Sequence, residues 1–443
     1  MRSPRPRREG GSHAADAAAQ LAPTATGPIP VTPSGAGASL ADDAGDGGRE
    51  RLPAEIWIII AATFFVAIGF GLIIPVLPQF AASFEVDATL VGVVISAFAF
   101  MRLVSAPGAG ASVDRFGEQR TYVVGLLIVA VSSIASAFAQ EYWQLLAFRA
   151  FGGIGSVMFT VAASALIIRF SPDRLRGRIS AMWGGTFLFG NIAGPAIGGV
   201  LGQLGMRIPF IAYGVALIIA AGIIGFALHR PARRSGGAEG PERKGAPLRI
   251  RVVLGDSAYR ASLASGFAAG WSNFGVRSAV VPLFIAAVVT QEPWAAGLVL
   301  AVAAAGNVLA LLVAGKGSDT RGRRPFLIIG LLVAALGLGA TPLASELWLL
   351  LAISFVGGVG SGLAAPAQQA TMGDLVGRDR QGGQVLASLQ MVQDVGTIAG
   401  PIVAGIIIDH VGYGWAFWAS AAILVLGALA WVPAREPAEA ASR

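Results

Sequence analysis

The sequence predicts an all-α polytopic membrane protein with twelve transmembrane helices in two six-helix halves. Hydrophobic residues make up 55% of the chain and charged residues only 13%, about half the charged share of an ordinary soluble domain. The chain contains about twelve apolar runs of roughly 20 residues, the length at which a helix crosses a ~30 Å hydrocarbon layer. Short motifs also recur about 205 residues apart. This repeat predicts a duplicated architecture.

The predicted elements follow one another in a regular order. Residues 1–52 are rich in Ala, Gly, Pro and Arg and have no apolar run, which predicts a disordered cytoplasmic tail. We expect an N-terminal six-helix half over 53–228, a cytoplasmic linker over 229–257, a C-terminal half over 258–433 and a cytoplasmic tail over 434–443. Spans are expected at about 56–80, 90–112, 121–138, 143–168, 179–201, 208–228, 259–288, 294–314, 325–343, 347–370, 384–408 and 415–432.

Basic residues set the expected orientation. Nearly all of the 32 Lys and Arg residues fall on the side of the membrane that holds both termini. Arg207 falls on the other side, and the remaining exceptions lie inside spans. This asymmetry follows the positive-inside rule, so we expect a multi-pass protein of the cell inner (plasma) membrane with both termini in the cytoplasm. The positive net charge therefore indicates topology and not a nucleic-acid partner.

Several kinds of site are excluded. The chain has no cysteine, which excludes disulfides, thiol nucleophiles and thiolate metal sites. Its three histidines lie in tails or loops without a metal-binding pattern, and we expect no cofactor. The Gly360-Ser-Gly362 stretch lies inside an apolar span with no strand before it, which argues against a dinucleotide site.

A short polar turn between spans 2 and 3 recurs between spans 8 and 9. The first copy contains Gly110, Asp114, Arg115, Gly117 and Arg120, and the second contains Asp319, Gly322, Arg323 and Arg324. A carboxylate in such a turn suits a helix N-terminus, where free N–H groups and the helix dipole favour negative charge. The simpler interpretation is a basic cytoplasmic loop with turn glycines.

Two further motifs lie within spans. Span 4 carries Arg149, followed by closely spaced glycines, and an arginine inside a span needs a partner or a cavity. Span 5 carries glycines four residues apart, which open a flat face for close packing, and a proline that bends the helix. The span 5 residues are Gly190, Gly194, Pro195, Gly198 and Gly199.

On these motifs the chain resembles the major facilitator superfamily, and within it the twelve-span drug:proton antiporters, over roughly residues 53–433. The first polar turn resembles the pattern G-x-x-x-D-R-x-G-R-R, but Glu118 and Gln119 stand where that pattern has bases. In the second copy Thr320 replaces the first Arg. The span 5 run matches G-x-x-x-G-P-x-x-G-G, the antiporter signature. The resemblance implies two parallel halves around a site near the membrane midplane.

The resemblance also implies residue roles. The two polar turns would form a conformational lock, in which Asp114 caps the start of span 11 and contacts neighbouring arginines; Asp319 and Arg323 belong to the second copy. Arg149 would assist proton transfer, although an arginine that extends towards the outer surface is an alternative. The span 5 motif would seal the contact between halves, with general small-residue packing as the alternative.

Two buried charges suggest a coupling site. Asp394 is the only carboxylate well inside a span, roughly 13–15 Å into span 11 at ~1.5 Å per residue. Burial disfavours its charged form, which suits a group that loads and unloads protons. Arg102 lies at a similar depth in span 2. We hypothesise an Arg102–Asp394 pair that bridges the halves in one access state and is weakened by a proton or a cationic substrate. A static ion pair is the alternative.

Other polar residues inside spans are cavity candidates, each also compatible with ordinary interhelical packing: Asn191, Trp271, Asn273, Arg277, Asn307, Gln390 and Gln393. Arg277 has no acid at its level, so it lines an outer vestibule or attracts an anionic substrate.

The sequence thus predicts a monomeric secondary transporter in the lipid bilayer that exports small amphipathic compounds or drugs, coupled to protons, by alternating access. One alternative is a proton-coupled or facilitative importer of a small solute. Another, from a different class, is a non-transporting membrane receptor or enzyme, against which the short outer loops argue.

Overall fold

The computed structural model describes residues 54–171, 175–227, 254–376 and 383–435, and within these ranges every regular element is a helix. The expected tails 1–52 and 434–443 and the linker 229–257 therefore lie almost entirely outside the described residues.

The first half contains a divided first span and five long helices. The elements are α1 (Ala54–Ile73), α2 (Leu77–Ala82), α3 (Ala88–Phe116), α4 (Glu118–Ala137), α5 (Tyr142–Phe170), α6 (Arg176–Gln203) and α7 (Ile208–Ala227). The division follows from Pro75, which cannot donate a backbone hydrogen bond, and α2 then begins with Pro78 in its first turn. At the start of α3 the Asp87 side chain accepts a hydrogen bond of 2.8 Å from the Leu90 N–H.

The second half has a first span with an unexpected local geometry. That span comprises α9 (Ser257–Ala269), the π-helical segment η2 (Gly270–Val276), α10 (Arg277–Phe284) and a second π-helical segment, η3 (Ile285–Val289). Hydrophobic periodicity does not reveal such π-helical turns, which often lie at functional sites. The remaining elements are α11 (Pro293–Arg321), α12 (Arg323–Ala340), η4 (Thr341–Leu343), α13 (Leu347–Val376), α14 (Gly383–Val411) and α15 (Tyr413–Leu429).

The described helices have membrane-spanning length and composition. Eleven of them, with α9 to η3 taken together, are long and apolar enough to cross a membrane. The helix α15 adds a shorter apolar helix of 17 residues, which spans about 26 Å at 1.5 Å per residue. The predicted all-α polytopic fold is confirmed.

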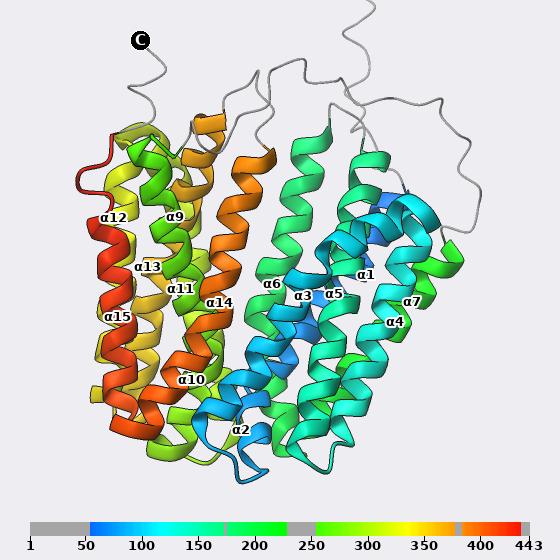
Figure 1. The fold of residues 1–443 in the computed structure, drawn as a ribbon, viewed down its shortest axis with the longest axis horizontal. Coiled ribbons are helices and arrows are strands. Elements are labelled where there is room, and N and C mark those ends of the chain that lie inside the picture. The colour runs from blue at the N-terminus through cyan, green and yellow to red at the C-terminus, as the bar shows by residue number, and fades with distance from the viewer. Residues whose placement is uncertain (1–53, 172–174, 228–253, 377–382, 436–443) are drawn as a thin grey trace, which may run out of the picture. The chain divides into compact units, whose positions relative to one another are not determined.

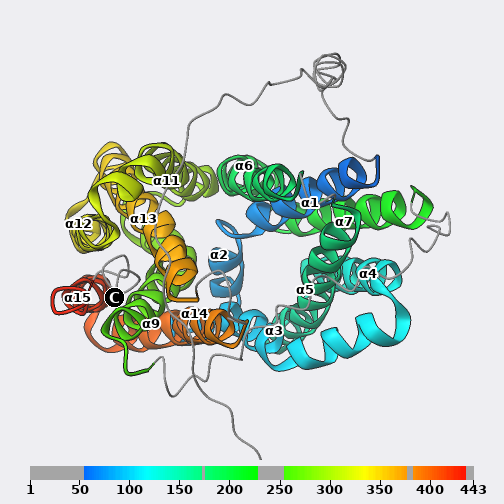
Figure 2. The same ribbon diagram turned by 90° about the horizontal axis from the view of Figure 1, so that it is seen from above.

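The helices pack as two groups, each around its own hydrophobic core. Tyr122 and Phe210 are fully buried in the core of α1–α7, and Phe417 and Trp431 in that of α9–α15. Figure 1 shows the two groups, blue to green and green to red. Seen from above, they meet where α3 lies beside α14 and α6 beside α11 (Figure 2).

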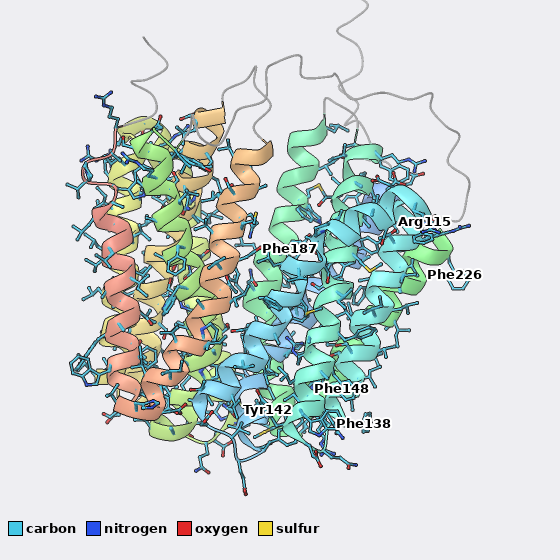
Figure 3. The ribbon with its side chains drawn as sticks, in the orientation of Figure 1. Arg115, Phe138, Tyr142, Phe148, Phe187 and Phe226 are labelled. Carbon is cyan, nitrogen blue, oxygen red and sulfur yellow. The ribbon has the colours of Figure 1, made fainter. Side chains whose placement is uncertain are left out.

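The two ends of the helices differ in charge. The end where α3 finishes and α4 begins is called the basic end, and the end where α2 finishes and α3 begins is called the acidic end. Figure 3 shows Arg115 at the basic end, and Phe138 and Tyr142 at the acidic end. Described residues at the basic end include Arg115, Arg120, Arg169, Arg321, Arg323 and Arg324; those at the acidic end include Glu85, Asp87, Glu141, Glu292, Glu346 and Asp409.

Candidate functional site

A cavity of about 650 Å³ lies between the two helix groups and is lined by residues of both. Most of its surface is apolar, with aromatic rings from Phe70, Phe98 and Phe274. Among the described residues, its charged lining consists of Arg102 on α3, Arg149 on α5, Arg277 on α10 and Asp394 on α14. All three intramembrane arginines and the one intramembrane acid singled out from the sequence therefore face one space.

Most of the polar cavity candidates also line this space: Asn191, Asn273, Arg277, Asn307, Gln390 and Gln393. Trp271 does not, and its placement corrects the expectation. Its indole is 6% exposed and donates a hydrogen bond of 3.1 Å to the Ser420 hydroxyl. Residues two apart lie on nearly opposite faces of a helix, about 200° apart at 3.6 residues per turn, so Trp271 points away from the face that Asn273 gives to the cavity. Asn273 from the same segment lines the cavity and accepts a hydrogen bond of 2.8 Å from Ser361.

Asp394 and Arg102 occupy facing helices without forming an ion pair. The Gln390 side-chain amide donates to the Asp394 carboxylate at 2.9 Å. The Arg102 guanidinium donates to the Ser156 hydroxyl at 3.1 Å. The two charges still interact electrostatically across the cavity. The hypothesised pair is therefore open in this structure and stays a prediction for the other access state.

Arg149 is held deep inside the first half. Its side chain is 5% exposed, and its guanidinium carbon lies 4.6 Å from the centre of the Phe98 ring, a cation–π contact. Its Nε atom is buried and has no hydrogen-bond partner among the described residues. This placement does not match an arginine that extends to the membrane surface.

The halves are joined at the acidic end through a carboxylate that the sequence did not single out. Asp409, near the end of α14, accepts hydrogen bonds of 2.9 Å from the backbone N–H groups of both Ala88 and Thr89. It also accepts one of 2.5 Å from the Thr89 hydroxyl. Asp409 thus caps the N-terminus of α3, where free N–H groups favour an anion. No pattern in the sequence links these two distant positions.

Close backbone contacts reinforce this closure. A methyl group added at Gly92 of α3 would lie 2.4 Å from the Pro401 carbonyl oxygen of α14. One added at Gly405 would lie 2.5 Å from the Ala88 carbonyl oxygen. Further along, the Ser96 hydroxyl donates to the Ile398 carbonyl at 2.7 Å. Only glycine permits such an approach of two helices.

The span 5 motif divides its contacts between two helices. Methyl groups added at Gly190, Gly194 and Gly198 would lie 2.2–2.6 Å from atoms of α1, within the same half. A methyl group added at Gly199 would instead lie 3.0 Å from the Gly297 Cα of α11, in the other half. The motif residue Pro195 contributes its carbonyl oxygen, 2.3 Å from the position of a methyl at Gly297. The motif therefore contacts the opposite half mainly through its last turn.

At the basic end, Asp114 of the first polar turn has no hydrogen-bond or ion-pair partner among the described residues. Asp114 is exposed, and the guanidinium carbon of Arg115 lies 5.3 Å from the centre of the neighbouring Phe116 ring. Gly110 has open space around it. The turn glycines Gly117 and Gly322 have φ of 84° and 88°, a conformation that favours glycine. The side chain of Asp319 lies outside the described atoms.

Each copy of the turn forms an ion pair with a helix of its own half, and the acid and the base have exchanged places between the two copies. Glu118 pairs with Arg169 at 2.9 Å in the first half, and Arg323 pairs with Asp374 in the second. Each residue stands 205 positions from its counterpart. Glu118 departs from the superfamily pattern, but its negative charge has a positively charged partner in Arg169.

The contacts described between halves lie towards the acidic end. Glycines near the basic ends of their helices have open space around them instead, namely Gly108, Gly184, Gly315 and Gly373. In Figure 1 the α6 and α14 ribbons are likewise apart at the basic end, whereas the two groups meet near α2 and α10. The lining residues Gln369 and Gln390, near the basic ends of α13 and α14, are exposed, whereas Ile73 and Leu77 at the acidic end are buried, so the cavity opens towards the basic end.

A two-half helical bundle with a charged cavity that is closed at one end defines a membrane transport protein. The profile of the Major Facilitator Superfamily matches residues 59–288 and 263–443. The chain belongs to this superfamily and is a secondary transporter of small molecules in the lipid bilayer. This assignment also confirms that it is not an enzyme.

Individual relatives are distant. The chain is 27% identical to tetracycline resistance protein class H of Pasteurella multocida over 82% of this chain and 90% of that protein. It is 31% identical to multidrug resistance protein 2 of Bacillus subtilis over 38% of this chain, and the match spans only 42% of that protein. In fold it is similar to an inward-facing bacterial homologue of the human lysosomal transporter Spinster, with a TM-score of 0.72, 17% identity, and coverage of 86% and 96% of the two chains.

Proposed function

We propose that this transporter exports small amphipathic compounds from the cytoplasm in exchange for protons, by alternating access. One observation carries the proposal: a largely apolar cavity lies between the halves, and Asp394 is the one carboxylate among its described lining residues. The apolar walls suit compounds with a ring or an alkyl body, and an intramembrane acid suits proton exchange. Export is supported by the span 5 motif and by the resistance proteins among the relatives.

The basic end faces the cytoplasm in this proposal, since positively charged loops stay inside. The protein then lies in the plasma membrane as a monomer with both termini in the cytoplasm. The cavity described above is accordingly open inwards, in the state that collects substrate.

Coupling runs through the contact between α3 and α14. A proton on Asp394 removes the negative charge that faces Arg102, so it changes the electrostatic energy of bringing these two helices together. Arg149, buried in the same cavity wall, assists proton transfer. In the opposite state Arg102 and Asp394 form the pair that is open here, and Asp114 caps the start of α14, with Arg115, Arg120 and the second-copy residues Asp319 and Arg323 completing the lock.

The experiment is transport by the purified full chain in proteoliposomes with an imposed pH gradient. The probes share one ring system and differ in charge: naphthylmethylammonium, naphthalene sulfonate and the zwitterion naphthylalanine. We expect at least one of them to be driven by the gradient, and the direction of movement separates export from import. A chain that moves none of them under a gradient would contradict the proposal.

The first prediction concerns the acid. Asp394→Asn should abolish gradient-driven accumulation while exchange of the same probe between equal concentrations continues, because the cavity survives but the proton carrier is lost. Glu292→Gln, which changes an exposed acid at the acidic end, is the control and should transport normally. Wild-type accumulation by the Asn variant would show that the coupling site lies elsewhere.

A further inference from the structure

The charges of the cavity do not balance. Three arginines face one aspartate among its described lining residues, so the lining carries an excess of two positive charges. An unpaired guanidinium within a membrane protein is costly and is retained where it has a function. None of the three arginines makes an ion pair with a described residue. The excess therefore needs a counter-charge that the described chain does not supply.

Arg149 provides one side of such a site. It is almost fully buried, lines the cavity and has a buried N–H without a hydrogen-bond partner among the described residues. Its contact with Phe98 uses the face of the guanidinium. The edge, where the N–H donors lie, is the part that binds carboxylates and sulfonates in a two-point geometry.

Arg277 provides the other side, although it does not occupy the repeat position that corresponds to Arg149. The repeat places Ser354 at the position in the second half that corresponds to Arg149 in the first. Arg277 comes from a different helix, α10, yet its guanidinium lies beside this position: it lines a void of about 10 Å³ together with Ser354 and Gly357. One of its terminal nitrogens lies 3.2 Å from where a methyl at Gly357 would be. Arg277 therefore lines the main cavity, and one terminal nitrogen of its guanidinium reaches the place in the second half that corresponds to Arg149 in the first.

We propose that the cavity binds amphipathic compounds that carry an acidic group, a carboxylate, sulfonate or phosphate, between Arg149 and Arg277. The proposal rests on the function proposed above, since it takes this cavity as the substrate site. Arginine suits the task because its planar donors match the oxygens of such groups. The apolar and aromatic walls accept the rest of the molecule. A substrate that also carries an amino group would place it near Asp394, where it competes with a proton as exchange requires.

The test is equilibrium binding to the purified full chain, measured by calorimetry with naphthalene sulfonate and naphthylmethylammonium. Because hydrogen bonds to charged groups are worth a factor of about ten or more in affinity, we expect the sulfonate to bind at least about tenfold more tightly than the ammonium compound. Arg277→Gln should weaken sulfonate binding about tenfold and leave ammonium binding equal or tighter. Arg277→Lys, which keeps the charge, should retain most of the preference.

Arg207→Gln is the matched control, since Arg207 is an exposed arginine at the acidic end outside the cavity; both affinities should be unchanged. Equal binding of the two probes by the wild-type protein, or tighter binding of the ammonium compound, would overturn the proposal without any variant. So would an unaltered preference in a folded Arg277→Gln protein. Gradient-driven transport of the ammonium probe alone would leave the proposed export intact and refute only the acidic substrate class. Sulfonate binding without gradient-driven transport of any probe would support the acidic substrate class and contradict the proposed export.

Discussion

The acidic and basic ends of the α3–α14 contact each have an aspartate near a helix N-terminus, but only the one at the acidic end is paired among the described residues. At the acidic end Asp409 of α14 caps the N-terminus of α3, and the glycines around it allow the helices to touch. At the basic end Asp114 of α3 is exposed and unpaired among the described residues, and Gly108 faces open space. Under the proposed function Asp114 caps α14 in the opposite state. Each helix would then lend a carboxylate to the start of the other, one end at a time.

The largest effect should come from breaking the glycine contact at the closed end. A methyl at Gly92 would lie 2.4 Å from a backbone oxygen of Pro401, and backbone cannot move aside as a side chain can. Overpacking of this kind costs about 1–3 kcal/mol. Gly92→Ala should therefore raise the population open at the acidic end by about 5- to 150-fold. The same substitution at Gly108, on the same helix, should leave this state unchanged, because nothing lies within 4 Å.

The chain itself simplifies the measurement, since it contains no cysteine. A single cysteine introduced at Ser278, a cavity residue, reports its accessibility to a membrane-impermeant maleimide added from the acidic side. A cysteine at Gln369, another cavity residue and an exposed one, reports access from the basic side. Equal labelling of the Gly92→Ala and Gly108→Ala proteins would refute the assignment of Gly92 to the closed gate.

These two ends also show what the sequence could predict. The spans follow from apolar length, and the repeat follows from motif spacing, so the fold was predictable. Most of the polar and charged cavity residues were predictable, because a polar side chain inside a span needs a polar partner or a cavity. Asp409 was not, because its partners are backbone N–H groups more than 300 residues away, and backbone donors leave no mark on composition. Trp271 was misplaced because it lies two residues from Asn273, and side chains two residues apart face nearly opposite sides of a helix.

The reversed ion pairs illustrate a signal that was present but not used. Glu118 was a departure from a motif when considered alone. Compared with positions 205 residues away, Glu118 and Arg169 correspond to Arg323 and Asp374, so both members of the pair have exchanged sign together. Comparing the two repeats can therefore reveal ion pairs through compensating charge exchanges as well as through identical residues.

The next largest effect should come from removing the carboxylate of the closed gate. Asp409→Ala eliminates two hydrogen bonds to backbone N–H groups and one to a hydroxyl. These bonds are partly exposed to water, so we expect about a tenfold increase in maleimide labelling at position 278 from the acidic side. Glu346→Ala removes an exposed carboxylate at the same end that has no described contact with the other half, and it should label like the wild type. Labelling of the Asp409→Ala protein at the wild-type level would mean that Asp409 does not hold the gate.

The smallest effect should come from the open end, and its sign should be opposite. Asp114→Asn should not weaken the state described here, because Asp114 makes no hydrogen bond or ion pair with a described residue. It weakens only the state in which the basic end is closed, where a surface carboxylate at a helix N-terminus contributes about 0.3–1 kcal/mol. Labelling at position 278 from the acidic side should therefore fall by about two- to fivefold, while labelling at position 369 from the basic side rises or stays the same. Combined with Asp409→Ala, the two shifts should partly cancel, since the substitutions destabilise opposite states of one equilibrium. A double variant that labels like Asp409→Ala alone would show that Asp114 is no counterpart of Asp409, and that the resemblance between the two ends is only one of residue type.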